Sequence, residues 1–146
     1  MTKRVVIGVL GIRDFDDQEI IHSRLDKFLG KLKNDDSVVK SFITTDEKGS
    51  CALVRDYLGS KEIPCKVYAA DWDGNGKAAG FMRSEYIIGD SQTVIVFWDG
   101  ECQFLQSLIN KILAARKLVK VIRVEKTEKA YYPLKDRPRT EKVLQR

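Results

Sequence analysis

Short apolar runs rich in β-branched residues recur along this chain, and longer segments of helical period separate them. The runs cover residues 5–10, 38–44, 65–70, 93–98 and 119–124. Continuous apolar runs are typical of strands that are buried on both faces of a parallel sheet. Alternation of strands and helices places the connecting helices over those two faces. We therefore predict an α/β fold: a three-layer Rossmann-like sandwich with a five-stranded, mainly parallel sheet.

The helical period ends well before the chain does. The last long amphipathic segment contains six apolar residues at helical spacing, namely Phe104, Leu105, Leu108, Ile109, Ile112 and Leu113. After the apolar run 119–124 the pattern stops, and Pro133 and Pro138 interrupt a polar stretch. We therefore predict one domain over residues 1–124 and a basic, proline-broken C-terminal tail over residues 125–146.

Charge and cysteine content narrow the classes of protein. The net charge is +5, and residues 125–146 contribute +3 of it through seven Lys or Arg and four Asp or Glu. Three cysteines without CxxC spacing indicate reduced thiols and a cytoplasmic location, and with a single histidine no metal and no cofactor is expected. No run approaches the ~18 apolar residues of a membrane span, and the first residues leave no room for a secretory signal.

Ligands of open parallel sheets bind beyond the carboxyl ends of the strands. The loops expected there are residues 11–15, 45–50, 71–80 and 99–101. In the third of them, Asp71 and Trp72 precede a glycine-containing loop that leads to Lys77 and Arg83. Cations suit an anion such as phosphate, an indole can cover a ring, and a carboxylate can accept from hydroxyls. The stretch indicates a class of ligand without defining a reaction.

Four motifs in these loops occur in order along the chain: Gly11-x-Arg13-Asp14-Phe15, Ala70-Asp71-Trp72, Gly76-Lys77-Ala78-Ala79-Gly80-x-x-Arg83 and Phe97-Trp98-Asp99-Gly100. Together they resemble the YspA-like branch of the SLOG superfamily, a Rossmann-like group related to the LOG phosphoribohydrolases and to DprA. The resemblance implies binding of a nucleotide or nucleotide-derived ligand. It implies ligand-binding roles for Gly11, Arg13, Lys48, Gly49, Asp71, Trp72, Lys77, Gly80, Arg83, Trp98, Asp99 and Gly100.

The chain departs from that branch where a phosphate would be held. Thr45-Asp46 replaces a glycine pair, and Phe104-Leu105 replaces a Gly-Thr at the start of the last helix. Glycines let backbone N–H groups approach phosphate oxygens, whereas Asp46 and Glu47 add negative charge and Phe104 fills space. We therefore predict a sensor or non-catalytic binder, and we assign no catalytic residue.

Two other functions stay open at this point. The tail can act as an arm for nucleic acid or protein, with Lys135, Arg137 and Arg139 on phosphates and Tyr131 and Tyr132 stacked on bases. Alternatively, the chain can hydrolyse an N-glycosidic or phosphoester bond in a nucleotide, as the resemblance allows. Association into a homo-oligomer is compatible with an open sheet, and no membrane partner is expected.

Overall fold

The computed structural model describes residues 3–132 and 140–145. Six strands and their connecting helices follow one another along the chain. Their bounds are β1 (Lys3–Gly11), α1 (Gln18–Asn34), β2 (Ser37–Thr45), α2 (Ser50–Ser60), β3 (Cys65–Ala70), α3 (Trp72–Asn75), the 3-10 turn η1 (Gly76–Ala78), α4 (Ala79–Asp90), β4 (Thr93–Trp98), α5 (Gln103–Ala114), β5 (Leu118–Arg123) and β6 (Thr140–Gln145).

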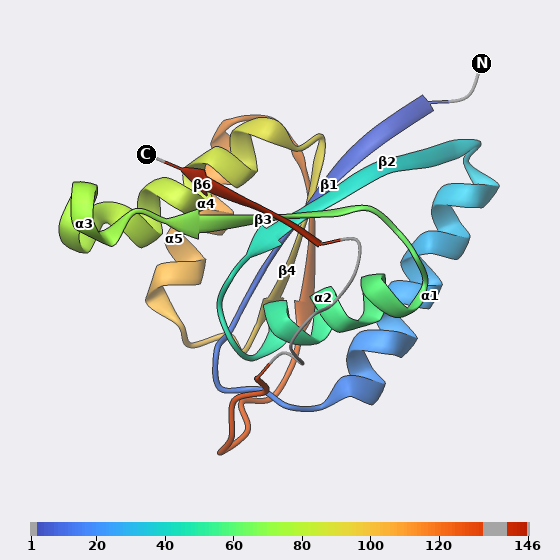
Figure 1. The fold of residues 1–146 in the computed structure, drawn as a ribbon. Helices are drawn as coiled ribbons and strands as arrows, with labels where there is room; N and C mark the ends of the chain where they lie inside the picture. Colours follow the sequence, from blue (N-terminus) through green and yellow to red (C-terminus); the bar gives the residue numbers. More distant parts are fainter. Residues whose placement is uncertain (1–2, 133–139, 146) are drawn as a thin grey trace.

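The strands form one sheet in the order β5-β4-β1-β2-β3-β6, and each neighbouring pair is parallel. Helices α1 and α2 cover one face of this sheet, and α4 and α5 cover the other (Figure 1). The predicted α/β class, the three layers and the five strands are confirmed. Within the described residues, no helix has both the length and the apolar character needed to cross a bilayer.

The sixth strand lies in the segment that was predicted to be a tail. Residues 140–145 pair with β3, in a register that sets Cys65 opposite Thr140 and Ala70 opposite Gln145. The segment contains only two apolar residues, Val143 and Leu144, so it lacks the continuous run that identified the other strands. An edge strand pairs on one side only and often carries polar residues, which explains why the pattern did not reveal it.

The core surrounds β1 and β4, two neighbouring inner strands of the sheet. Ile7 and Val9 of β1 and the four consecutive residues 94–97 of β4 have no exposed surface, and consecutive side chains of a strand point to opposite faces. Their burial on both faces accounts for the uninterrupted apolar pattern of these runs. The carboxyl ends of β1 and β4 are therefore rigidly held, and the loops that follow them project from a fixed edge.

Lys117 connects the start of β5 to the end of α4. Its Nζ donates to the carbonyl oxygens of Ile88, Gly89 and Ser91 at 2.7, 2.8 and 2.7 Å. A cation is favoured at the carboxyl end of a helix, where carbonyl groups lack partners. The replacement Lys117→Met keeps much of the stem and removes the ammonium, and should lower the free energy of unfolding by about 2 kcal/mol.

Urea unfolding measures this change. The control is Lys33→Met, at an exposed position of α1 for which no ion pair is found among the described residues. The control should change stability by less than about 0.5 kcal/mol. Equal losses in the two variants would contradict a specific role for the three hydrogen bonds of Lys117.

Candidate functional site

Loops from β1, β2 and β3 and the start of α4 border an open pocket at the carboxyl end of the sheet. Its volume is about 480 Å³. We call it the edge pocket, and it is lined by Arg13, Asp46, Glu47, Lys48, Trp72, Arg83 and Tyr132. Four of the residues predicted to bind ligand, Arg13, Lys48, Trp72 and Arg83, thus lie around one hollow.

A second hollow lies beside the edge pocket, between the loops that follow β1 and β4. The strand order reverses between these two strands, and such a point commonly holds the ligand of an open α/β sheet. The hollow measures about 350 Å³, and Arg13, Asp99, Cys102 and Lys126 are among its lining residues. Arg13 borders both hollows, so a ligand in the edge pocket can extend past it towards β4.

Arg83 is the electrostatic centre of the edge pocket. Its side chain is only 4 % exposed. Its Nη1 lies 3.1 Å from Asp46 and its Nη2 lies 3.2 Å from Glu47. Glu47 also pairs with Arg13 at 3.6 Å. The two carboxylates therefore already pair with arginines that a phosphate would otherwise contact.

The loop that carries these carboxylates is fixed by Arg55 from α2. Arg55 is buried, and its Nη1 donates to the carbonyl oxygens of Thr45 and Glu47 at 2.5 and 2.9 Å. A charged donor to backbone oxygens holds the chain more firmly than a neutral one. The role of Arg55 was not predictable, because a lone arginine within an amphipathic helix carries no signal of its buried partners.

The amino end of α2 is closed to an anion by the chain itself. The N–H of Gly49 donates to the carbonyl oxygen of Tyr131 at 2.7 Å. The N–H and hydroxyl of Ser50 both donate to the carbonyl oxygen of Ile12, at 3.1 and 2.7 Å. Gly11 allows this approach, since a Cβ there would lie 2.1 Å from the hydroxyl oxygen of Ser50. Gly11 and Gly49 thus position the loops and do not line the edge pocket.

Residues 124–132, which we call the C-terminal strap, run across the loops that follow β1 and β2. The N–H of Thr127 donates to the carbonyl oxygen of Asp14 at 2.8 Å, and that of Tyr131 donates to the carbonyl oxygen of Phe15 at 3.0 Å. With the bond from Gly49, these contacts hold the strap against the body. The first part of the predicted tail is therefore docked on the domain.

The two tyrosines of the strap have different surroundings. The Tyr131 hydroxyl is hydrogen-bonded to the Asp56 carboxylate, which anchors this ring to α2. Tyr132 is 67 % exposed and lines the edge pocket, where the Nζ of Lys48 donates to its hydroxyl at 3.1 Å. The remaining residues predicted for a nucleic-acid or partner arm lie outside the described residues: Lys135, Arg137 and Arg139.

Trp72 offers a ring surface at the rim of the pocket. The indole is 57 % exposed and rests over Gly80, where a Cβ would lie 3.3 Å from the ring carbon Cη2. Its neighbour Asp71 accepts from the N–H of Gly74 at 3.1 Å and caps α3. Asp71 and the exposed Lys77 do not line the edge pocket, so the structure separates them from Trp72 and Arg83.

Three residues predicted to bind ligand, Trp98, Asp99 and Gly100, lie at the end of β4 and in the turn that follows it. The Nε1 of Trp98 donates to the carbonyl oxygen of Cys102 at 3.1 Å. Burial raises the pKa of Asp99, but the N–H groups of Glu101 and Cys102 outweigh that effect and hold the pKa below its ordinary value. Gly100 completes the turn with a φ of 83°. Of these residues, Asp99 reaches the hollow beside Arg13.

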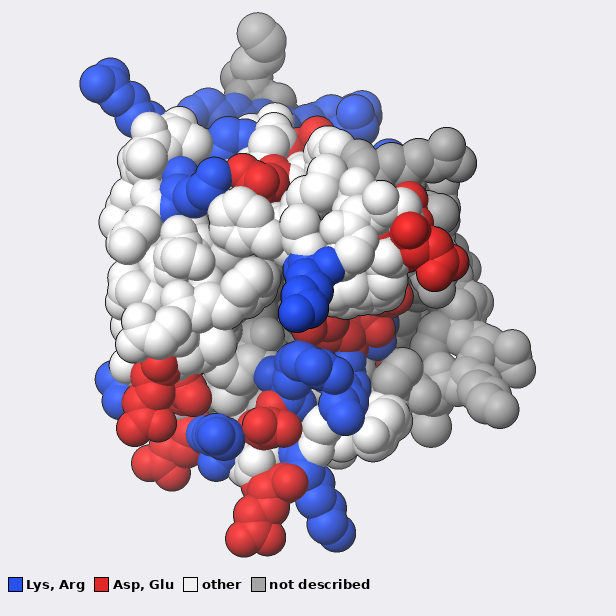
Figure 2. Space-filling model, turned by 90° about the vertical axis from the view of Figure 1, so that its left-hand side faces the viewer, with Lys and Arg blue, Asp and Glu red and all other residues white. Residues whose placement is uncertain are grey.

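Figure 2 shows one face of the molecule, on which the charges are mixed. Basic and acidic side chains lie next to one another in its lower half, whereas much of its upper left carries no charge. An open phosphate cradle would present a one-sign surface. Mixed charges also occur in the edge pocket, where Arg13 and Arg83 pair with Glu47.

The three thiols differ in access, and this gives a test of the site's geometry. Cys51 and Cys65 are buried, and burial raises the pKa of the Cys65 thiol to about 12. Cys102 is half-buried and lines the hollow beside Arg13. Because thiolate access controls the reaction with an aromatic disulfide reagent, the native chain should release about one equivalent quickly. Cys102→Ser should abolish that fast phase, and a fast phase that persists would contradict the arrangement.

The groups that the site can present to a ligand are thus cations, carboxylates and aromatic rings. Among the described residues, no three His, Cys, Asp or Glu side chains are grouped so as to hold a metal ion. Comparison of the chain with models of protein families, with curated proteins and with solved structures gives no match in any of the three.

Proposed function

We propose that this chain binds a nucleotide or nucleotide-derived ligand in the edge pocket, as a sensor or non-catalytic binder. One observation carries the proposal: Arg13, Lys48, Trp72 and Arg83, all predicted from the sequence to bind ligand, line the same pocket. They come from separate parts of the chain, after β1, after β2, in α3 and in α4. A volume of about 480 Å³ lies within the range of small-molecule sites.

Each group in the pocket has a plausible partner in such a ligand. Trp72 provides a ring face for a base. Arg13 and Lys48 suit an anionic group, and the carboxylates of Asp46 and Glu47 suit sugar hydroxyls. With three cations and two carboxylates the pocket holds a net +1, which favours a ligand with few phosphates over a triphosphate.

The pairing of charges supports binding over catalysis. The Asp46 and Glu47 carboxylates are held by Arg83, and the N–H groups of Gly49 and Ser50 at the start of α2 are bonded to carbonyl oxygens. A general base needs freedom to take a proton, and a phosphate in transfer needs unoccupied donors. The resemblance to the SLOG superfamily supports the class of ligand, and this proposal extends it to a diverged member.

Thermal unfolding in the presence of nucleosides, nucleoside monophosphates and triphosphates, NAD and ADP-ribose tests the proposal. A ligand at about one hundred times its Kd should raise Tm by about 5 °C or more. Trp72→Ala should weaken that ligand by about tenfold or more, because stacking on one ring is lost. Lys77→Ala is the matched control, because Lys77 is an exposed cation close in sequence that does not line the pocket.

Two results would count against the proposal in different ways. If no compound of the panel raises Tm while the chain stays folded, the edge pocket does not bind this class of ligand. If free base or phosphate accumulates above background in the same mixtures, the pocket is an active site and the non-catalytic part of the proposal fails.

A further inference from the structure

Another hollow, lined by basic residues and separate from the edge pocket, lies between α1 and the edge strand β5. Its volume is about 260 Å³. We call it the α1–β5 groove. Its floor is apolar and consists of Phe28 and Leu32 from α1 and Leu118 and Ile122 from β5. Leu118 is 72 % exposed, so part of this apolar floor is in contact with water.

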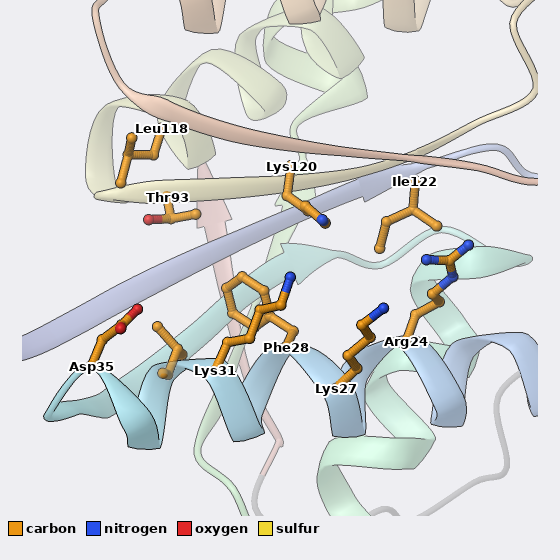
Figure 3. A pocket seen from close by; sticks show the side chains of 10 residues that line it. Arg24, Lys27, Phe28, Lys31, Asp35, Thr93, Leu118, Lys120 and Ile122 are labelled. Atoms are coloured by element: carbon orange, nitrogen blue, oxygen red, sulfur yellow. The ribbon is translucent and has the colours of Figure 1, made fainter.

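Four cations surround that floor. Figure 3 shows the amino groups of Lys27, Lys31 and Lys120 pointing into the space between the helix and the strands. Arg24 adds a fourth positive charge, and Asp35 is the one acidic side chain among the lining residues. Across residues 3–132, none of the four cations forms an ion pair. Convergence of like charges over apolar surface raises the free energy of the isolated chain and favours an anionic partner.

The spacing of the cations defines the shape of that partner. Arg24, Lys27 and Lys31 are three and four residues apart and so share one side of α1, over a length of about 10 Å. A single phosphate group is too small to contact all three. A second helix with acidic residues at the same spacing can contact them together.

The sheet offers a place for such a helix. β5 is the edge strand of the sheet, and α5 packs against it from the opposite face. Among the described residues, the face of β5 towards the groove is open at the start of the strand, where Leu118 is 72 % exposed and Lys120 is exposed, whereas Ile122 is buried in the core. In layered α/β folds an apolar sheet face is normally covered by a helix. A helix placed there would bury the floor and set its acids against α1.

We propose that the α1–β5 groove docks an amphipathic helix of a partner protein, with an apolar stripe on Leu118 and Leu32 and an acidic flank on Lys27 and Lys31. A nucleic acid would satisfy the cations but would leave the apolar floor in water. A second copy docked groove to groove would bring eight cations together. Charge complementarity and the apolar floor therefore favour the acidic helix.

The probe is a synthetic helical peptide of about 18 residues, long enough to exceed the groove, with leucines on one face and glutamates beside them. It is titrated into the isotopically labelled full chain, and amide shifts are followed by NMR. Saturable shifts confined to residues 24–35 and 118–122 are expected. Affinity should fall at higher salt, because ion pairs at a surface are screened.

Charge reversal locates the contact. The double variant Lys27→Glu, Lys31→Glu should weaken the peptide by about tenfold or more, since attraction becomes repulsion at two sites. The matched control is Lys33→Glu, an exposed residue of the same helix that does not line the groove, and it should change affinity by less than about threefold. Peptides with the glutamates changed to glutamines, or the leucines to alanines, should both lose about tenfold.

Other outcomes overturn the proposal. Equal affinity of the double variant and the control, or shifts outside the groove, would exclude docking of an acidic helix at this place. Tighter binding of a thymidine oligonucleotide at the same residues would assign the groove to nucleic acid. A dimer that dissociates on Leu118→Asp in sedimentation measurements would assign it to a second copy of the chain.

Discussion

Gly49→Ala is expected to lower the free energy of unfolding by about 3 kcal/mol or more, because two effects add at this position. Gly49 has a φ of 84°, a backbone conformation that residues with a Cβ rarely adopt. An added Cβ would also lie 2.1 Å from the carbonyl oxygen of Arg13, a backbone atom that cannot turn away. Either the loop after β1 or the start of α2 must move.

Chemical unfolding of Gly49→Ala and Gly30→Ala side by side measures this effect. Gly30 lies in the interior of α1, and a Cβ there meets nothing within 4 Å. Its replacement by alanine should raise stability by about 0.5–1 kcal/mol, since glycine is a poor helix former. Two variants with similar, small changes would show that the contact between Gly49 and Arg13 is not tight.

The double variant Asp46→Asn, Glu47→Gln is expected to have the second large effect. It keeps the shapes of the side chains but removes both negative charges from Arg83, whose side chain is 4 % exposed. Removal of the partners of a buried charge costs about 3–5 kcal/mol, and we expect the lower end because the two carboxylates are partly exposed. The free energy of unfolding should therefore fall by about 3 kcal/mol.

The same variant should gain affinity for anions. With its carboxylates neutral, the edge pocket holds three cations, and inorganic phosphate bound there should restore stability as its concentration rises. The control variant is Asp16→Asn, Glu19→Gln, which removes two exposed charges outside the pocket and reports the general effect of salt. If phosphate stabilises the two variants equally, Asp46 and Glu47 do not occupy an anion position.

Strands β1 to β5 were predictable, because burial in the sheet produces apolar runs that are visible in the sequence. Residues 93–98 are β-branched or aromatic throughout, which is typical of a buried strand, and β4 occupies that range. β6 lacks such a mark, since hydrogen bonds to β3 involve the backbone and demand no apolar run. Its place in the sheet depends on contacts between residues about 75 positions apart in the chain.

The cations of the site were predictable from residue type and place, whereas their partners were not. Arg83 follows a motif, but its pairing with Asp46 joins α4 to the loop after β2. Tyr132, predicted to stack on bases in an arm, lines the edge pocket. Its position follows from the docking of the strap through Tyr131, a tertiary contact that leaves no local pattern.

The C-terminal strap sets an order of events during synthesis of this protein. Strands β1 to β5 and helices α1 to α5 precede residue 124, so the ribosome releases them before the strap exists. Until Tyr131 arrives, the N–H of Gly49 lacks the carbonyl oxygen that it contacts in the finished fold, and the edge pocket lacks the wall that Tyr132 provides. A nascent chain that ends before Tyr131 therefore leaves the N–H of Gly49 to the solvent, and the edge pocket is completed only when the strap is in place.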